Sequence, residues 1–103
     1  MDMETAVVMT TISGRERAEA LAEQLIANEL AACVQIAEVF SVYRWDGKIQ
    51  REREFLLMIK GRSDLFPRLQ AFILAHHDYE LPELIKLDIV DGNAKYLRWL
   101  QGN

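Results

Sequence analysis

Two long extended segments that meet at a tight turn constrain the fold of this chain more than any other feature. Residues 31–45 and 48–60 flank Asp46-Gly47, a dipeptide that tolerates the positive φ angles of a type I′ turn, so they predict one long β-hairpin. An arm of about 13 residues at ~3.3 Å per residue spans more than about 40 Å. A compact domain of 103 residues is only roughly 33 Å across. The hairpin tip must therefore project from the body of the domain.

The projecting tip carries large aromatic side chains. Tyr43 and Trp45 lie on the first arm, opposite the polar residues 50–54 of the second arm. An isolated monomer would expose these aromatic rings to water. We therefore expect an obligate oligomer.

The segment before the hairpin predicts a strand and a helix. Residues 6–12 are rich in β-branched and apolar side chains at consecutive positions, which indicates a strand that is buried on both faces. Ser13 and Glu16 form a capping-box pattern, and apolar residues at helical spacing then continue to about Asn28.

A second helix and a fourth strand follow the hairpin. Ser63 or Asp64 is the expected cap of this helix, which ends near residue 77. Apolar and charged residues alternate over residues 85–89, which predicts a strand. Asn93 is then expected to cap a short terminal helix.

The element order is therefore β-α-β-β-α-β plus a C-terminal helix, which predicts an α+β, ferredoxin-like fold over a single domain, residues 1–103. In this fold a four-stranded antiparallel sheet carries both main helices on one face and leaves the other face bare. Because residues 6–9 are apolar on both faces, we expect another subunit to cover the bare face.

Composition and charge exclude several classes of function. The 12 Lys and Arg residues against 16 Asp and Glu residues give a net charge of −4 without a basic cluster, so we expect no nucleic-acid partner. The apolar run at residues 55–59 is far shorter than the roughly 18 residues of a membrane span, so we expect no membrane association. Asp2 and Glu4 stand where a secretory signal needs basic residues, which favours a cytoplasmic location.

The single cysteine, Cys33, cannot form a disulfide within the chain. Two interpretations stay open: a small apolar residue buried in a strand, or a thiolate that binds a soft metal. One thiolate and one imidazole are too few for a closed zinc site, but they suit copper of low coordination number, especially where symmetry brings copies together. His76 and His77 are adjacent and point about 100° apart on a regular helix, so both can hardly bind one ion from it.

The segment before the last strand gathers ionisable side chains. His77, Asp78, Tyr79 and Glu80 follow one another there. The chain has no marked nucleophile–base motif and no glycine-rich phosphate loop, so we expect no enzymatic activity. Lys60, in the third predicted strand, is either a solvated edge charge or a contact for a buried anion.

Four motifs, which occur in order and cover nearly the whole chain, resemble the CutA divalent-cation-tolerance family. They are Leu30-Ala31-Ala32-Cys33-Val34, Tyr43-Arg44-Trp45-Asp46-Gly47-Lys48-Ile49, His77-Asp78-Tyr79-Glu80-Leu81-Pro82-Glu83, and Gly92-Asn93 with Tyr96-Leu97-Arg98-Trp99-Leu100. The combination is specific, whereas each motif alone would not be.

The resemblance implies a tight homotrimer of ferredoxin-like subunits that exchange sheet edges and hairpins, similar in architecture to PII signalling proteins. It also implies tolerance to divalent cations and binding of copper, as Cu(I) or Cu(II), or of another divalent cation in the cytoplasm, with no obligatory cofactor. The cysteine and histidine positions of the family fall on Cys33 and His77. Asp78 replaces the proline that is usual in the family loop and adds a carboxylate beside His77.

Our leading hypothesis is a non-enzymatic, homotrimeric copper- or divalent-metal-binding protein. Cys33 and His77 are the expected ligands, and Asp78 or Glu80 would supply oxygen donors or orient the ligands.

The alternative is a PII-like signalling or interaction module that binds a small ligand in clefts between subunits. The resemblance places Trp45, Lys60, Tyr79 and Glu80 near these clefts, with Lys60 as the contact for an anion and the aromatic rings as walls. In a third interpretation, the trimer is a stable scaffold that orders a partner.

Overall fold

A computed structural model describes residues 4–102 of the chain. Its elements, in chain order, are β1 (Thr5–Ile12), α1 (Arg15–Ala27), β2 (Cys33–Trp45), β3 (Lys48–Arg62), the 3-10 turn η1 (Ser63–Leu65), α2 (Phe66–His76), β4 (Ile85–Ile89) and α3 (Ala94–Leu100). The strands form one antiparallel sheet in the order β2-β3-β1-β4. This topology confirms the predicted ferredoxin-like α+β fold.

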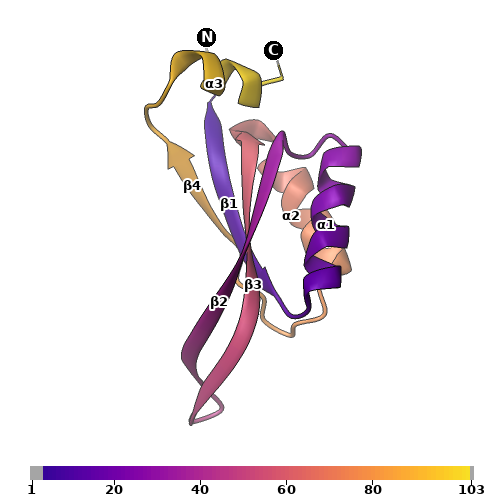
Figure 1. The fold of residues 1–103 in the computed structure, drawn as a ribbon, viewed down its shortest axis with the longest axis vertical. Coiled ribbons are helices and arrows are strands. Elements are labelled where there is room, and N and C mark those ends of the chain that lie inside the picture. The colour runs from indigo at the N-terminus through magenta and orange to yellow at the C-terminus, as the bar shows by residue number, and fades with distance from the viewer. Residues whose placement is uncertain (1–3, 103) are drawn as a thin grey trace.

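The core lies between the sheet and the two long helices, because α1 and α2 cover the same face of the sheet (Figure 1). Val8 of β1 and Leu57 of β3 point to this face and are buried in one cluster with Leu25 of α1 and Ile73 of α2. Full burial of each such side chain contributes roughly 1.5–3 kcal/mol to the free energy of unfolding. These contacts hold the helix layer on one face of the sheet.

The long hairpin of β2 and β3 is present as the sequence predicts, and all 13 residues of β2 pair with β3. Asp46 has a φ of 54° and Gly47 a φ of 74°, the positive values that a type I′ turn requires. The hairpin tip extends beyond the helices (Figure 1), and the longest dimension of the molecule is 47 Å. The predicted projection of the tip is thus confirmed.

The start of α1 differs from the prediction. Gly14, with a φ of 87°, is the N-cap residue, and no side chain caps the helix. Ser13 precedes this N-cap residue by one position, so its hydroxyl group does not cap the helix. The predicted capping box of Ser13 and Glu16 is therefore wrong, because the helix begins one residue later than that pattern requires.

The predicted caps of the other two helices have opposite outcomes. The turn η1 precedes α2, so Leu65 is the N-cap residue, and Asp64 pairs with Arg62 at 2.6 Å. Neither Ser63 nor Asp64 caps α2, which corrects the prediction. The predicted cap of α3 is confirmed, because Asn93 accepts a hydrogen bond of 3.0 Å from the backbone N–H three residues later. No helix among residues 4–102 is long and apolar enough to cross a membrane.

The face of the sheet opposite α1 and α2 carries apolar side chains, and no described helix lies over it (Figure 1). Val7 of β1 lies opposite Leu87 of β4, and Met9 lies opposite both Ile85 and Met58. Leu87 is 51% exposed, while Val7 and Met9 are half-buried. We call this surface the open face; it confirms that β1 carries apolar residues on both of its sides.

Candidate functional site

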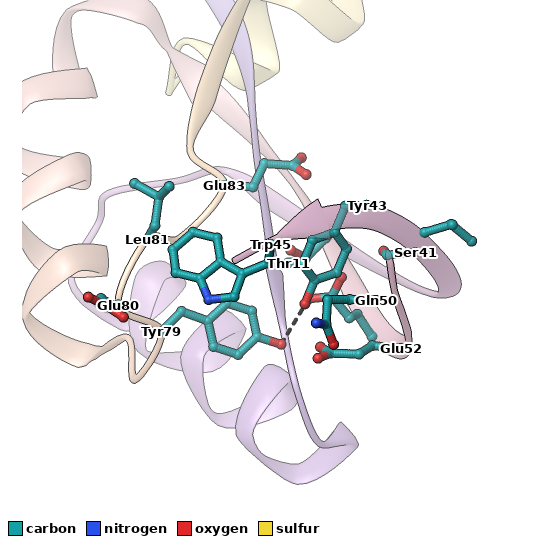
Figure 2. A pocket seen from close by; sticks show the side chains of 12 residues that line it. Thr11, Ser41, Tyr43, Trp45, Gln50, Glu52, Tyr79, Glu80, Leu81 and Glu83 are labelled. Atoms are coloured by element: carbon teal, nitrogen blue, oxygen red, sulfur yellow. Dashed lines mark hydrogen bonds between the residues drawn. The ribbon is translucent and has the colours of Figure 1, made fainter. Parts of the chain in front are cut away.

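A cleft of about 640 Å³ lies between the hairpin and the loop that follows α2 (Figure 2). Alternate residues of a strand point to the same face, so Tyr43 and Trp45 of β2 lie on one side of the hairpin with Glu52 and Glu54 of β3. Tyr79 of the loop faces these side chains across the cleft. The hairpin and the loop together therefore build the site.

The lining of this cleft is acidic. Glu52 and Glu54 of β3 and Glu80 and Glu83 of the loop contribute carboxylates, and no Lys or Arg is among the lining residues. In the described part of the chain, none of these carboxylates lies within 4.0 Å of a basic nitrogen. Negative charges gathered in a cleft repel anions and attract cations, so the cleft favours cationic ligands.

Tyr79 and Glu54 form the hydrogen bond at the centre of the cleft. The Tyr79 hydroxyl group donates to Oε2 of Glu54 at 2.8 Å, and Glu54 is only 5% exposed. Burial and this bond to Glu54 raise the pKa of Tyr79 far above its ordinary value of 10.0. Tyr79 therefore stays protonated and remains a hydrogen-bond donor at all physiological pH values.

His77 connects the loop after α2 to strand β1. Its Nε2 donates to the backbone carbonyl of Thr11 at 2.7 Å, and its Nδ1 accepts from the N–H of Tyr79 at 3.2 Å. A carbonyl only accepts and an N–H only donates, so the partners assign the neutral Nε2–H tautomer. The ring is 1% exposed, and both of its nitrogens are occupied by protein partners.

Asp78 lies on the surface next to His77. Nη1 of Arg17 on α1 is 2.6 Å from its carboxylate, and its other oxygen lies 3.9 Å from Nδ1 of His77. The hydrogen bond from the Arg17 guanidinium lowers the pKa of Asp78 below its ordinary value of 3.8. Asp78 is therefore a charged oxygen donor, with Arg17 as its present partner.

Cys33 and Lys60 lie at the other end of the sheet. They are directly opposite one another on β2 and β3, and Nζ of Lys60 donates to Gln35 at 2.6 Å. Lys60 also lies opposite Val7 of β1, four residues before the Thr11 that binds His77. Four residues along a strand span roughly 13 Å. Cys33 and His77 of the same chain therefore cannot bind one ion.

The structure thus divides the predicted site residues into two groups. Trp45, Tyr79 and Glu80 line one cleft within the chain, and His77 and Asp78 are adjacent next to it. Cys33 and Lys60 form a separate pair on the open face. Within one chain, Lys60 is not part of the cleft, and Cys33 is not part of a ligand group with His77.

Sequence reasoning did not select Glu52 and Glu54 as site residues, although they carry much of the cleft's charge. A signal for them exists, because they are two residues apart on a strand and so share a face with each other. Their position relative to Trp45 follows from the hairpin turn, which fixes the register of both arms. The position of the turn and the alternation of side chains together would have predicted that Glu52 and Glu54 lie on the same side of the hairpin as Trp45.

Comparison with known proteins identifies the family. Residues 6–103 match the model of the family described as CutA1 divalent ion tolerance protein. The chain belongs to the CutA1 family. It is similar to the divalent-cation tolerance protein CutA of Thermus thermophilus, with 40% identity over 98 residues, which cover 94% of this chain and 95% of that protein. Family membership confirms the resemblance found in the sequence motifs.

Plant members of the CutA1 family are similar at a comparable level. The chloroplastic protein CutA 1 of Oryza sativa is 44% identical over 98 residues, which cover 94% of this chain and 55% of that protein. The chain spans about half the length of the plant relatives it matches.

Solved structures of CutA1 proteins share the fold. The crystal structure of CutA1 from Oryza sativa superimposes with a TM-score of 0.91 at 43% identity, covering 95% of this chain and 91% of that one. The CutA1 structure from Thermus thermophilus also has a TM-score of 0.91, at 39% identity, covering 96% of this chain and 97% of that one.

Proposed function

We propose that this CutA1 family member is a non-enzymatic, cytoplasmic homotrimer that binds copper or another divalent cation and thereby contributes to tolerance of divalent ions. The family description and the name of the Thermus thermophilus relative support the role in tolerance. The observation that carries the metal proposal is the position of Cys33, which is half-buried on the open face rather than sealed beneath the helices.

The open face supports the oligomeric part of the proposal. It combines half-exposed apolar side chains such as Ile85 and Leu87 with the hairpin that projects from the body of the subunit. The unpaired edges of the sheet, β2 and β4, offer backbone groups to a second copy. Covering the open face with other copies would remove its apolar surface from water.

The open face also supplies soft ligands beyond Cys33. Met9 and Met58 lie directly opposite one another on β1 and β3, on the same face as Cys33. Thiolate and thioether sulfurs are the donors that Cu(I) prefers. His77 and Asp78 of a neighbouring copy are the further candidate donors, and His77 would have to release Thr11 and Tyr79 in order to bind.

Copper titration with the oligomer mass monitored alongside tests this proposal. The purified protein is titrated against a competing chelator with Cu(I) under reducing conditions and, separately, with Cu(II). We expect tight binding that weakens at least about tenfold in Cys33→Ala, while sedimentation equilibrium gives about 36 kDa, three times the 11.9 kDa of one chain.

The histidine ligand is tested with a matched pair of variants. His77→Ala is compared with His76→Ala, because His76 is an exposed neighbour that bonds its own helix through the Phe72 carbonyl. Loss of affinity in His77→Ala alone would support His77 as a ligand. Binding that Cys33→Ala leaves unchanged, or a mass near 12 kDa, would contradict the metal site or the trimer respectively.

The cleft favours a second candidate function, an interaction or signalling module that binds a small ligand. Its volume of about 640 Å³ lies within the roughly 300–1,000 Å³ typical of small-molecule sites. Lys60 lies outside the cleft of its own chain, and carboxylates line the cleft instead. The lining that one chain contributes therefore disfavours an anionic ligand.

A further inference from the structure

The chemical character of the cleft is set by two kinds of side chain. Aromatic rings come from Tyr43, Trp45 and Tyr79, and carboxylates come from glutamates that include Glu52 and Glu80. In Figure 2 the indole ring of Trp45 and the phenol ring of Tyr79 both face the interior of the cleft. Aromatic faces attract cations through their quadrupole, so both kinds of side chain select for positive charge.

The carboxylates are too dispersed to chelate a bare metal ion. Among residues 4–102 no group of three or more His, Cys, Asp or Glu side chains could hold one. Glu54 is also committed to the hydroxyl group of Tyr79. Positive charge spread over a larger organic group would meet several carboxylates and rings at once without requiring them to converge.

We propose that this cleft binds a small organic cation, an amine or a quaternary ammonium compound, with its charged group against Trp45 and Tyr79 and with Glu52 and Glu80 as counter-charges. This inference rests on the second candidate function, the ligand-binding module, and names the class of its ligand. It is independent of copper binding by Cys33, which lies at the other end of the sheet.

Tryptophan fluorescence of the intact oligomer provides the test. The chain has two tryptophans, and Trp99 lies on α3, so a Trp99→Phe background leaves Trp45 as the only reporter. The probes are choline and 3,3-dimethylbutan-1-ol, which have the same shape but differ in charge. We expect a saturable change with choline at concentrations up to about 10 mM and at least tenfold weaker binding of the neutral probe. The choline affinity should fall as salt is added.

Two lining variants and a matched control locate the binding. Glu52→Gln and Glu80→Gln each remove one charge with little change in shape and should weaken choline binding at least about threefold. Glu23→Gln removes the same charge from the exposed surface of α1 and should leave it unchanged. Because Glu80 is exposed on the loop, Glu80→Gln provides a readout even if Glu52→Gln disturbs folding.

Three results would overturn the inference: no saturable change with choline, equal binding of the neutral probe, or equal weakening in Glu23→Gln. Each is separable from failure of the metal proposal, because Cys33→Ala should weaken copper binding and leave choline binding intact. If choline does not bind but succinate, a small dianion, does, the cleft is a ligand site and only the assigned class of ligand is wrong.

Discussion

The hydroxyl group of Tyr79 donates a 2.8 Å hydrogen bond to Glu54 and so joins the loop after α2 to the base of the hairpin. Glu54 is almost fully buried and has no ion-pair partner among the described residues. A buried carboxylate needs such a donor, because water no longer solvates it. The bond therefore stabilises the fold and also fixes one wall of the acidic cleft.

Replacing Tyr79 with Phe should destabilise the protein by about 1–3 kcal/mol, since Glu54 would remain buried without its donor. Urea unfolding monitored by circular dichroism measures the change in the free energy of unfolding. Tyr96→Phe is the control, because Tyr96 lies on α3 and is exposed, and it should shift stability by less than about 0.5 kcal/mol. Equal effects of both variants would contradict the assigned role of the Tyr79 hydroxyl group.

His77 should contribute to stability even when no metal is present. Its ring is buried and bonds both Thr11 and the backbone of Tyr79, so His77→Leu leaves a carbonyl and an N–H without partners. We expect a loss of about 2 kcal/mol in the presence of a chelator, measured by urea unfolding. His76→Leu should cost much less because His76 is exposed. A His77→Leu variant as stable as the wild type would mean that the ring does not anchor the loop.

The ion pair of Arg17 and Asp78 predicts a pH dependence of stability. Arg17 lowers the pKa of Asp78 in the folded state below the value of about 3.9 expected when the chain is unfolded. The unfolded state then binds the proton more tightly, so the stabilisation is complete above pH ~4 and is lost as pH falls through the lowered pKa. Asp78→Asn should therefore lower the urea midpoint near pH ~7. Near pH ~2, where the wild-type carboxylate is protonated, the same substitution should leave the midpoint nearly unchanged.

A double-mutant cycle controls this prediction. In an Arg17→Gln background, Asp78→Asn should change the urea midpoint little at any pH, because the partner charge is already absent. The wild-type effect should also shrink in high salt, since both side chains are partly exposed. An Asp78→Asn effect of the same size in both backgrounds would show that Arg17 is not the cause.

Substitution of Gly61 on β3 should destabilise the protein through a steric clash rather than through backbone strain. A Cβ atom there would lie 3.3 Å from the backbone nitrogen of Ala32 and 3.4 Å from Cα of Ala31. We expect Gly61→Ala to cost about 1–3 kcal/mol in thermal or urea unfolding, because neither backbone contact moves easily. Gly92→Ala is the matched control, since the nearest atoms to its Cβ would belong to the flexible Leu97 side chain, at 3.4 Å. A smaller cost at Gly61 than at Gly92 would contradict this account.

Local signals in the sequence sufficed for the turn and for the last helix. Asp46-Gly47 specifies the hairpin turn, and Asn93 caps α3, because each residue acts on backbone within three positions of itself. The cap predicted at Ser13 failed because Gly14, with a φ of 87°, takes the N-cap position and α1 begins one residue later. The spacing of Ser13 and Glu16 alone cannot reveal a shift of one residue in the helix start.

The candidate site was predictable only where its residues belong to a local motif. The loop residues Tyr79 and Glu80 stood out as a motif, and Trp45 stood out beside the turn. Lys60 did not join them, because the register of the sheet places it opposite Cys33 at the far end of β2. The acidic character of the cleft came from Glu52 and Glu54, which become neighbours of the loop only through tertiary packing.

The open face should hold the subunits together, which a charge placed on it can test. Leu87 of β4 is 51% exposed on this face, and Leu74 of α2 is 49% exposed on the helix layer. If other copies cover the open face, Leu87→Lys buries a charge at the interface and should reduce the mass in sedimentation equilibrium toward the 11.9 kDa of one chain. Leu74→Lys makes the same chemical change at equal exposure and should leave the oligomer intact. An oligomer that survives Leu87→Lys but dissociates in Leu74→Lys would move the interface to the helices and leave the apolar open face without an explanation.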